Sequence, residues 1–232
     1  MNRHGERLTY PDYGREEILR DFAAHRMIVE QDDGVRRHLR FRNPASSTYW
    51  FDLVTWNGVL VINGDCGTYA FARLTDMFEF FRGGNGRSEI NPCYWAGKLL
   101  ASDQSDGHLK YSEQLGRDAV AEEMCRLRER GAPNEVVRDL RDAAVLDEDT
   151  RSLVASVQGW SYDKWEVNDF WDHKFEDYTR RFIWNLHAIV WGIAQYDASK
   201  EPKGPACGHI ACSQNFIDTG SVECVEGETD GS

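Results

Sequence analysis

The sequence lacks the short motifs of the common catalytic sites. It contains no glycine-rich phosphate loop, no dinucleotide-binding fingerprint and no G-x-S-x-G nucleophile elbow. Cys66 falls in a predicted turn with no histidine near it in the sequence, so no nucleophile with an adjacent base is recognisable. These absences favour a non-enzymatic protein. They do not exclude an enzyme that uses another kind of site.

Long hydrophobic runs are also missing. Residues 1–13 are polar and lack the apolar segment of a secretory signal peptide. The most apolar run, Phe182 to Ile193, is interrupted by Asn185 and His187 and is too short to span a bilayer. We therefore expect a soluble cytosolic protein with no membrane partner, in which the 6 cysteines are reduced.

Basic residues are in the minority. The 232 residues include 27 Lys and Arg against 39 Asp and Glu, which gives a formal net charge of -12 at pH 7. Such a protein repels the nucleic acid backbone at long range, so nucleic acid binding requires a local cluster of basic residues. The same charge suits a protein that docks onto a basic surface.

Aromatic residues are plentiful. They make up 12% of the chain and include 8 Trp, and hydrophobic residues reach 41%, which is enough for a packed core. Tryptophan and tyrosine collect at protein interfaces, so this richness favours a partner-binding protein. Trp95, Trp160 and Trp165 are the candidate anchors of such an interface. Nothing in the sequence indicates an oligomeric state.

Residues 26–82 alternate polar and apolar side chains between short turns, which predicts an antiparallel β-meander. The strands are predicted over residues 27–31, 35–42, 48–56, 59–63 and 68–72. Asn57-Gly58 is the preferred pair for a tight hairpin turn. A helix is predicted before the sheet, over Tyr13 to His25, and another after it, with Met77, Phe78 and Phe81 facing inward.

Residues 113–198 predict a helical C-terminal half. Trp160 to Asp197 is expected to be mostly helical, with one buried aromatic stripe formed by Trp171, Phe175, Tyr178 and Phe182. Phe182 to Tyr196 should be a central helix packed on the sheet. The predicted fold is therefore α+β, a meander of four to five strands with helices on one face. We expect one domain over residues 1–200 and a flexible acidic tail over residues 201–232.

A row of basic residues follows the second predicted strand. Its period of two places one set of side chains on one face, namely Arg36, His38, Arg40 and Arg42. Trp50 and Trp56 of the next strand would join this face because they share the parity of Asp52. Arginines beside aromatic rings suit single-stranded nucleic acid or another anionic ligand. The alternative is that cross-strand salt bridges to Asp52 neutralise the arginines.

Two sets of residues are candidate metal ligands, and no other cofactor is indicated. On a helix, the spacing of Asp169, His173 and Glu176 would place them on one face, where they could hold a divalent metal or form an ordinary wet surface. In the tail, four potential zinc ligands occur with a spacing unlike the common C-x2-C knuckle, namely Cys207, His209, Cys212 and Cys224. Free thiols are the alternative there.

Four blocks of the sequence carry a resemblance to a known family. They are FDLVTW at Phe51 to Trp56, GDCGTYAF at Gly64 to Phe71, DMFEFFR at Asp76 to Arg82 and WGIAQYD at Trp191 to Asp197. In these blocks the chain resembles a family of uncharacterised small proteins of tailed bacteriophages and prophages. The resemblance implies a phage origin, a location in the host cytoplasm and an accessory role during infection. It brings no catalytic residues with it.

These observations together favour a non-enzymatic phage accessory protein that binds a host or phage protein and inhibits a host defence system. The first alternative is a single-stranded nucleic-acid-binding module that uses the basic strand over residues 36–42. The second alternative is a metal-dependent enzyme.

Overall fold

The computed structural model describes residues 13–82, 90–146 and 149–201. The described residues up to Ser199 belong to one compact unit. The cysteines and histidine of the predicted zinc site, Cys207, His209, Cys212 and Cys224, lie outside the described residues. The same holds for the rest of the predicted tail beyond Glu201.

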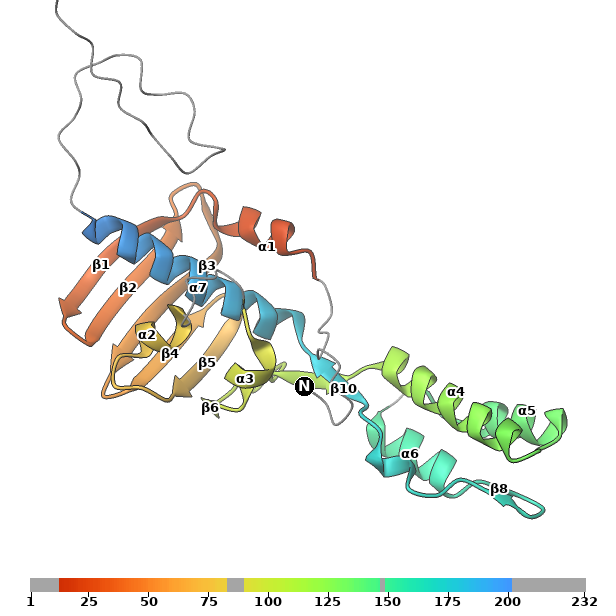
Figure 1. The fold of residues 1–232 in the computed structure, drawn as a ribbon. Coiled ribbons are helices and arrows are strands. Elements are labelled where there is room, and N and C mark those ends of the chain that lie inside the picture. Colours follow the sequence, from red (N-terminus) through yellow and green to blue (C-terminus); the bar gives the residue numbers. More distant parts are fainter. Residues whose placement is uncertain (1–12, 83–89, 147–148, 202–232) are drawn as a thin grey trace, which may run out of the picture. The chain divides into compact units, whose positions relative to one another are not determined.

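The first half of the chain folds into a six-stranded antiparallel sheet in which the strand order follows the sequence (Figure 1). Its strands are β1 (Arg26–Asp33), β2 (Arg36–Asn43), β3 (Ser46–Trp56), β4 (Val59–Gly64), β5 (Gly67–Ala72) and β6 (Leu99–Ala101). The predicted α+β fold with an antiparallel meander is confirmed, and the sheet has one strand more than the four to five expected. The additional strand, β6, has only 3 residues and pairs with β5 across a long connection.

Glycines permit the tight turns of this meander. Asn57 and Gly58 adopt positive φ values of 45° and 76°, as a two-residue hairpin turn requires. At Gly64 the requirement is steric instead: the Cβ of any other residue would lie 2.2 Å from the carbonyl oxygen of Trp50. The close pairing of β3 with β4 therefore depends on the missing side chain.

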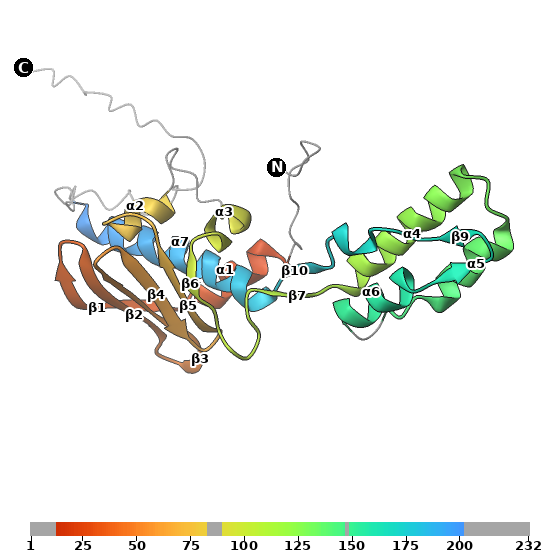
Figure 2. The ribbon, with the colours of Figure 1, turned by 90° about the horizontal axis from the view of Figure 1, so that it is seen from below.

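Helices pack on one face of the sheet, which we call the covered face (Figure 2). They are α1 (Arg15–Phe22), α2 (Met77–Arg82), α3 (Pro92–Ala96) and α7 (Arg180–Lys200). The predicted central helix is thus present as α7. It approaches β2 and β3 closely at Gly192, where a Cβ would lie 2.9 Å from Leu53 Cδ1.

The covered face also holds a partly buried ion pair. The Arg37 guanidinium on β2 donates to both carboxylate oxygens of Asp76 at 2.8 and 3.0 Å, and it stacks 4.5 Å from the Phe78 ring. Burial opposes the charged form of Asp76, but hydrogen bonds from Arg37 and from the Phe78 N–H outweigh it and lower the pKa of that carboxyl. This pair joins the sheet to the segment that begins α2.

The helical half of the chain has a hydrophobic core of its own. It contains α4 (Glu113–Glu129), α5 (Asn134–Ala143), α6 (Thr150–Gln158), the short strands β8 (Ser161–Tyr162) and β9 (Trp165–Glu166), and the 3-10 turn η1 (Phe170–Asp172). Two further strands, β7 (Leu109–Tyr111) and β10 (Glu176–Tyr178), pair antiparallel where the chain enters and leaves this half.

The helix predicted from Trp160 onward is wrong before Arg180. Residues 160–179 form the β8–β9 hairpin, η1 and β10 instead. Asp163 and Asp169 adopt positive φ values of 54° and 58°, which interrupts any helix through this segment. The supposed aromatic stripe is consequently not one face, since Phe175 is buried whereas Trp171 is 56% exposed.

Candidate functional site

The second face of the sheet, which we call the open face, has no described helix packed against it (Figure 2). Successive residues of β2 alternate between the two faces of the sheet. Arg37, Leu39 and Phe41 lie on the covered face and are buried. Their neighbours His38, Arg40 and Arg42 are half-buried and Arg36 is exposed. The alternation predicted for the basic strand is therefore present.

Asp52 on β3 is the centre of the charged part of this face. Its carboxylate accepts from His38 Nε2 at 3.3 Å and lies 3.0 Å from Arg42 Nη1 and 3.5 Å from Arg40 Nε. Arg40 also pairs with Glu30 of β1 at 3.0 Å. The arginines thus form the cross-strand salt bridges that the sequence raised as the alternative to an anion site.

The two predicted tryptophans lie on the open face but differ in environment. Trp50 is half-buried, and its ring lies 4.2 Å from the Arg42 guanidinium carbon. Trp56 is 43% exposed at the end of β3. Trp56 is therefore the aromatic ring on this face that is available to a partner.

An apolar strip continues the open face across β3, β4 and β5. It consists of Val54, Val59, Val61, Ala70 and Ala72, all half-buried. The pairing of strands makes the strip continuous, because Val61 lies opposite both Val54 and Ala70. This strip was not predicted, although the sequence carries its signal: Val59 and Val61 alternate with the core residues Leu60 and Ile62.

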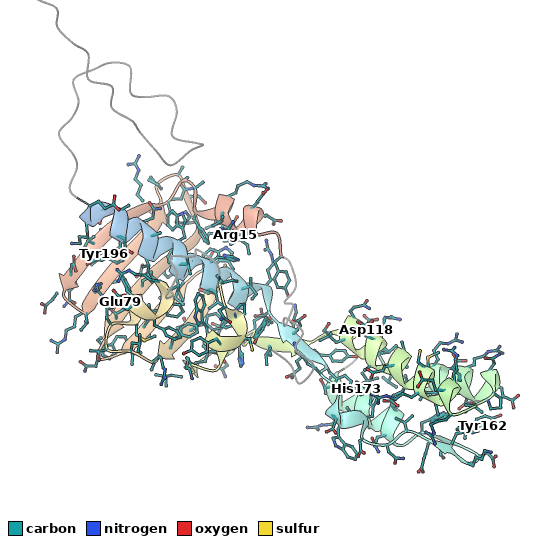
Figure 3. All side chains as sticks on the ribbon, in the orientation of Figure 1. Arg15, Glu79, Asp118, Tyr162, His173 and Tyr196 are labelled. Atoms are coloured by element: carbon teal, nitrogen blue, oxygen red, sulfur yellow. The ribbon has the colours of Figure 1, made fainter. Side chains whose placement is uncertain are left out.

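The metal site predicted at Asp169, His173 and Glu176 does not form. Asp169 precedes η1, His173 follows it and Glu176 is an exposed residue of β10, so the three do not share a helix face. Figure 3 labels His173 in the helical half. His173 instead contacts Glu123 of α4, Nε2 to Oε1 at 3.0 Å, and Arg126 also pairs with that glutamate. Within the described ranges, no group of three or more His, Cys, Asp or Glu side chains is placed to hold a metal ion.

The three tryptophans proposed as interface anchors are core residues. Trp95, Trp160 and Trp165 are 4%, 7% and 9% exposed. Trp95 packs against Phe81 on the covered face of the sheet, whereas Trp160 and Trp165 belong to the core of the helical half. Their burial leaves Trp56 and Trp171 as the exposed tryptophans of the described part of the chain.

Cys66 does not have the properties of a nucleophile. It sits in the β4–β5 turn, and burial raises the pKa of its thiol to about 11. The nucleophilic form is the thiolate, so this shift disfavours Cys66 as a nucleophile.

Comparison with known proteins gives no relative. No protein-family model, no curated protein and no solved structure matches this chain. No helix in the described part of the chain is long and apolar enough to cross a membrane.

Proposed function

We propose that this protein acts by binding a partner protein through the open face of its sheet, without turnover. The observation that supports this proposal best is the apolar strip, which lies beside the Asp52 ion-pair cluster and the exposed Trp56. Protein interfaces combine an apolar centre, a polar rim and an aromatic anchor. The open face has an apolar strip, a charged cluster and an exposed tryptophan. They stand on strands whose other side is packed against the helices of the covered face.

A protein partner suits this face better than nucleic acid. Arg40 and Arg42 are already paired with Glu30 and Asp52, so a phosphate would have to displace a carboxylate. The net charge of -12 also opposes approach of a polyanion. A nucleic-acid module remains the second candidate because Arg36 is exposed and forms no ion pair with any described residue.

The biological setting of the proposal is an infected host cell. The phage resemblance of the sequence supports an accessory role in the host cytoplasm, with a host or phage protein as the partner. Inhibition of a host defence system is the specific role that we propose, and that resemblance is its support.

Quantitative capture from nuclease-treated host lysate tests the proposal. We expect Trp56→Glu and Val61→Glu to lose the partner that the wild type retains, because each places a charge on the open face. Trp171→Glu is the matched control, since Trp171 is an exposed tryptophan of the helical half and its loss should leave capture unchanged.

The nuclease step separates the two candidates. If capture disappears on nuclease treatment, the nucleic-acid module replaces the protein-binding proposal. If Trp171→Glu abolishes capture while Trp56→Glu and Val61→Glu do not, the open face is not the binding surface.

A further inference from the structure

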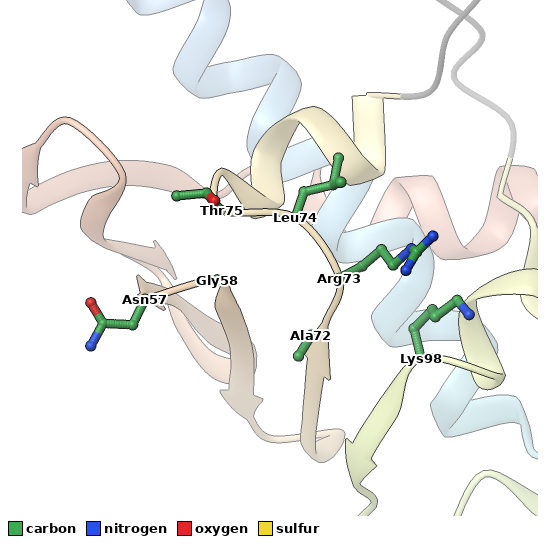
Figure 4. Close-up of a pocket in the computed structure, with 7 residues that line it drawn as sticks. All are labelled: Asn57, Gly58, Ala72, Arg73, Leu74, Thr75 and Lys98. Carbon is green, nitrogen blue, oxygen red and sulfur yellow. The ribbon is translucent and has the colours of Figure 1, made fainter.

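A hollow of about 680 Å³ lies at one end of the sheet (Figure 4). It is lined by the Asn57-Gly58 turn, by residues 72–75 after β5 and by Lys98 before β6. Ala72, which lines the hollow, pairs with Val59, and Val59 pairs with Trp56. The last row of the open face therefore ends at the hollow.

Two basic side chains line this hollow without an acidic partner. Neither Arg73 nor Lys98 forms an ion pair with a residue that the structure describes, in contrast to Arg40 and Arg42 on the same sheet. The backbone joins the two segments that carry these cations, because the N–H of Ala72, next to Arg73, donates to the Lys98 carbonyl at 3.1 Å. Two unpaired cations at one hollow form a positive site in a chain of net charge -12.

Exposed apolar groups stand around the same cations. Leu74 lines the hollow and is exposed, and Tyr94, also exposed, has its ring 5.4 Å from Lys98 Nζ. Exposed side chains of this size beside a hollow are typical of a binding site. The hollow thus combines positive charge with an apolar wall.

We propose that this hollow receives an acidic segment of the partner protein, with carboxylates on Arg73 and Lys98 and an adjacent aliphatic side chain on Leu74. The inference rests on the proposed function, since the hollow extends the open face. Charge complementarity selects an acidic ligand, and the net charge of -12 opposes the approach of a long polyanion such as nucleic acid more than that of a short acidic segment.

A peptide titration followed by NMR tests the inference. The probe is a blocked peptide of sequence Glu-Glu-Leu-Glu-Glu, and the matched control peptide carries Gln at every Glu position. We expect the acidic peptide to shift the amide signals of Gly58, Arg73 and Lys98, and the control peptide to leave them in place. The affinity should fall as salt is raised, because the contacts are exposed ion pairs.

Paired variants define the site. Arg73→Gln combined with Lys98→Gln should weaken peptide binding by about tenfold, the effect expected from losing two exposed ion pairs. The control combines Arg151→Gln with Lys110→Gln, which removes the same two charges from exposed positions outside the hollow. This control should bind the peptide like the wild type.

Other outcomes overturn the inference. The absence of shifts, equal shifts with the Gln peptide, or tighter binding of a thymidine oligonucleotide at the same amides would each contradict an acidic peptide site. The proposed function fails separately: if the acidic peptide binds the hollow but Val61→Glu still captures the partner, the open face is not the interface. If Val61→Glu loses the partner and the Arg73/Lys98 variant retains both partner and peptide, only the hollow is wrong.

Discussion

The two faces of the sheet are made by alternate residues of the same strands, yet they differ in burial, in charge and in the size of their side chains. On the covered face Leu39, Phe41, Phe51 and Leu53 are fully buried, and Phe41 stacks on Phe51 with ring centroids 4.6 Å apart. On the open face the intervening positions hold charged residues, small apolar residues and the exposed Trp56. A shift of register by one residue would exchange the two sets.

This difference teaches which residues hold the fold and which are free for binding. Burial of the covered face supplies the hydrophobic stabilisation, since each large side chain buried there is worth about 1.5–3 kcal/mol. Open-face side chains remain partly hydrated and contribute less. They can therefore be changed without unfolding the protein, and the predictions below test that separation.

The largest expected effect is the loss of the Arg37–Asp76 pair, in which Arg37 is buried and Asp76 is partly exposed. Arg37→Met leaves Asp76 without its bidentate partner, so we expect the free energy of unfolding to fall by about 3–5 kcal/mol. Urea denaturation of the variant and the wild type measures this. A loss below about 1 kcal/mol would show that the pair is as dispensable as a surface ion pair.

A pair of neighbouring residues compares the faces directly. Leu53 is buried under α7 and Val54 lies on the open face. Leu53→Ala should cost about 2–5 kcal/mol because it leaves a cavity, whereas Val54→Ala should cost less than about 1 kcal/mol. Equal losses in chemical denaturation would mean that both faces are packed.

Acid should destabilise the covered side through His187 of α7. Burial, with Arg15 as a smaller contribution, lowers the pKa of His187 to about 4 from 6.5. Between these values the unfolded chain binds the proton and the folded chain does not, so stability falls as the pH drops from 6.5 to 4. The full effect is about 3 kcal/mol.

Urea midpoints measured between pH 7 and pH 4.5 check this prediction. The variant His187→Gln should have a shallower pH dependence than the wild type. Burial also lowers the pKa values of His25 and His108, so some dependence of the same sign should remain. An unchanged slope in the variant would contradict the assignment to His187.

The smallest effect is expected from Arg40→Gln on the open face. Its pairs with Glu30 and Asp52 are partly exposed, so the free energy of unfolding should fall by less than about 1 kcal/mol. The comparison with Arg37→Met on the same strand sharpens the contrast between the faces. A loss similar to that of Arg37→Met would show that the open-face cluster is a structural element.

The sequence predicts the sheet well because its signals are local. Alternation in β2 to β5, the Asn57-Gly58 turn and the apolar run of α7 each depend on neighbouring residues. The strand β6 could not be predicted, since 3 residues carry no pattern and its place is set by pairing with β5.

The error over residues 160–178 has a different cause. The spacing of Trp171, Phe175 and Tyr178 matches a helix, but the three residues lie in η1, in the loop after it and in β10. Asp163 and Asp169 adopt positive φ values, which end any helix at these positions. Aspartate adopts positive φ more readily than most residues but also occurs in helices, so the sequence does not reveal this conformation.

The candidate site was only half predictable. The parity of Arg40, Arg42 and Trp56 follows from period two, and Asp52 was identified as a possible partner. Whether the arginines are paired, and which tryptophans are exposed, depends on side chains from distant elements. The hollow combines Gly58, Arg73 and Lys98, which lie far apart in the sequence and meet only through the pairing of β4, β5 and β6.

The central claim is that the open face binds a partner protein while the covered face holds the fold. The most direct measurement compares Val61→Glu with Leu60→Glu, two adjacent residues of β4 on opposite faces. Thermal unfolding and partner capture after nuclease treatment are recorded for both variants. We expect Val61→Glu to fold and lose the partner, and Leu60→Glu to fail to fold. A folded Val61→Glu that captures the partner as the wild type does would contradict the account.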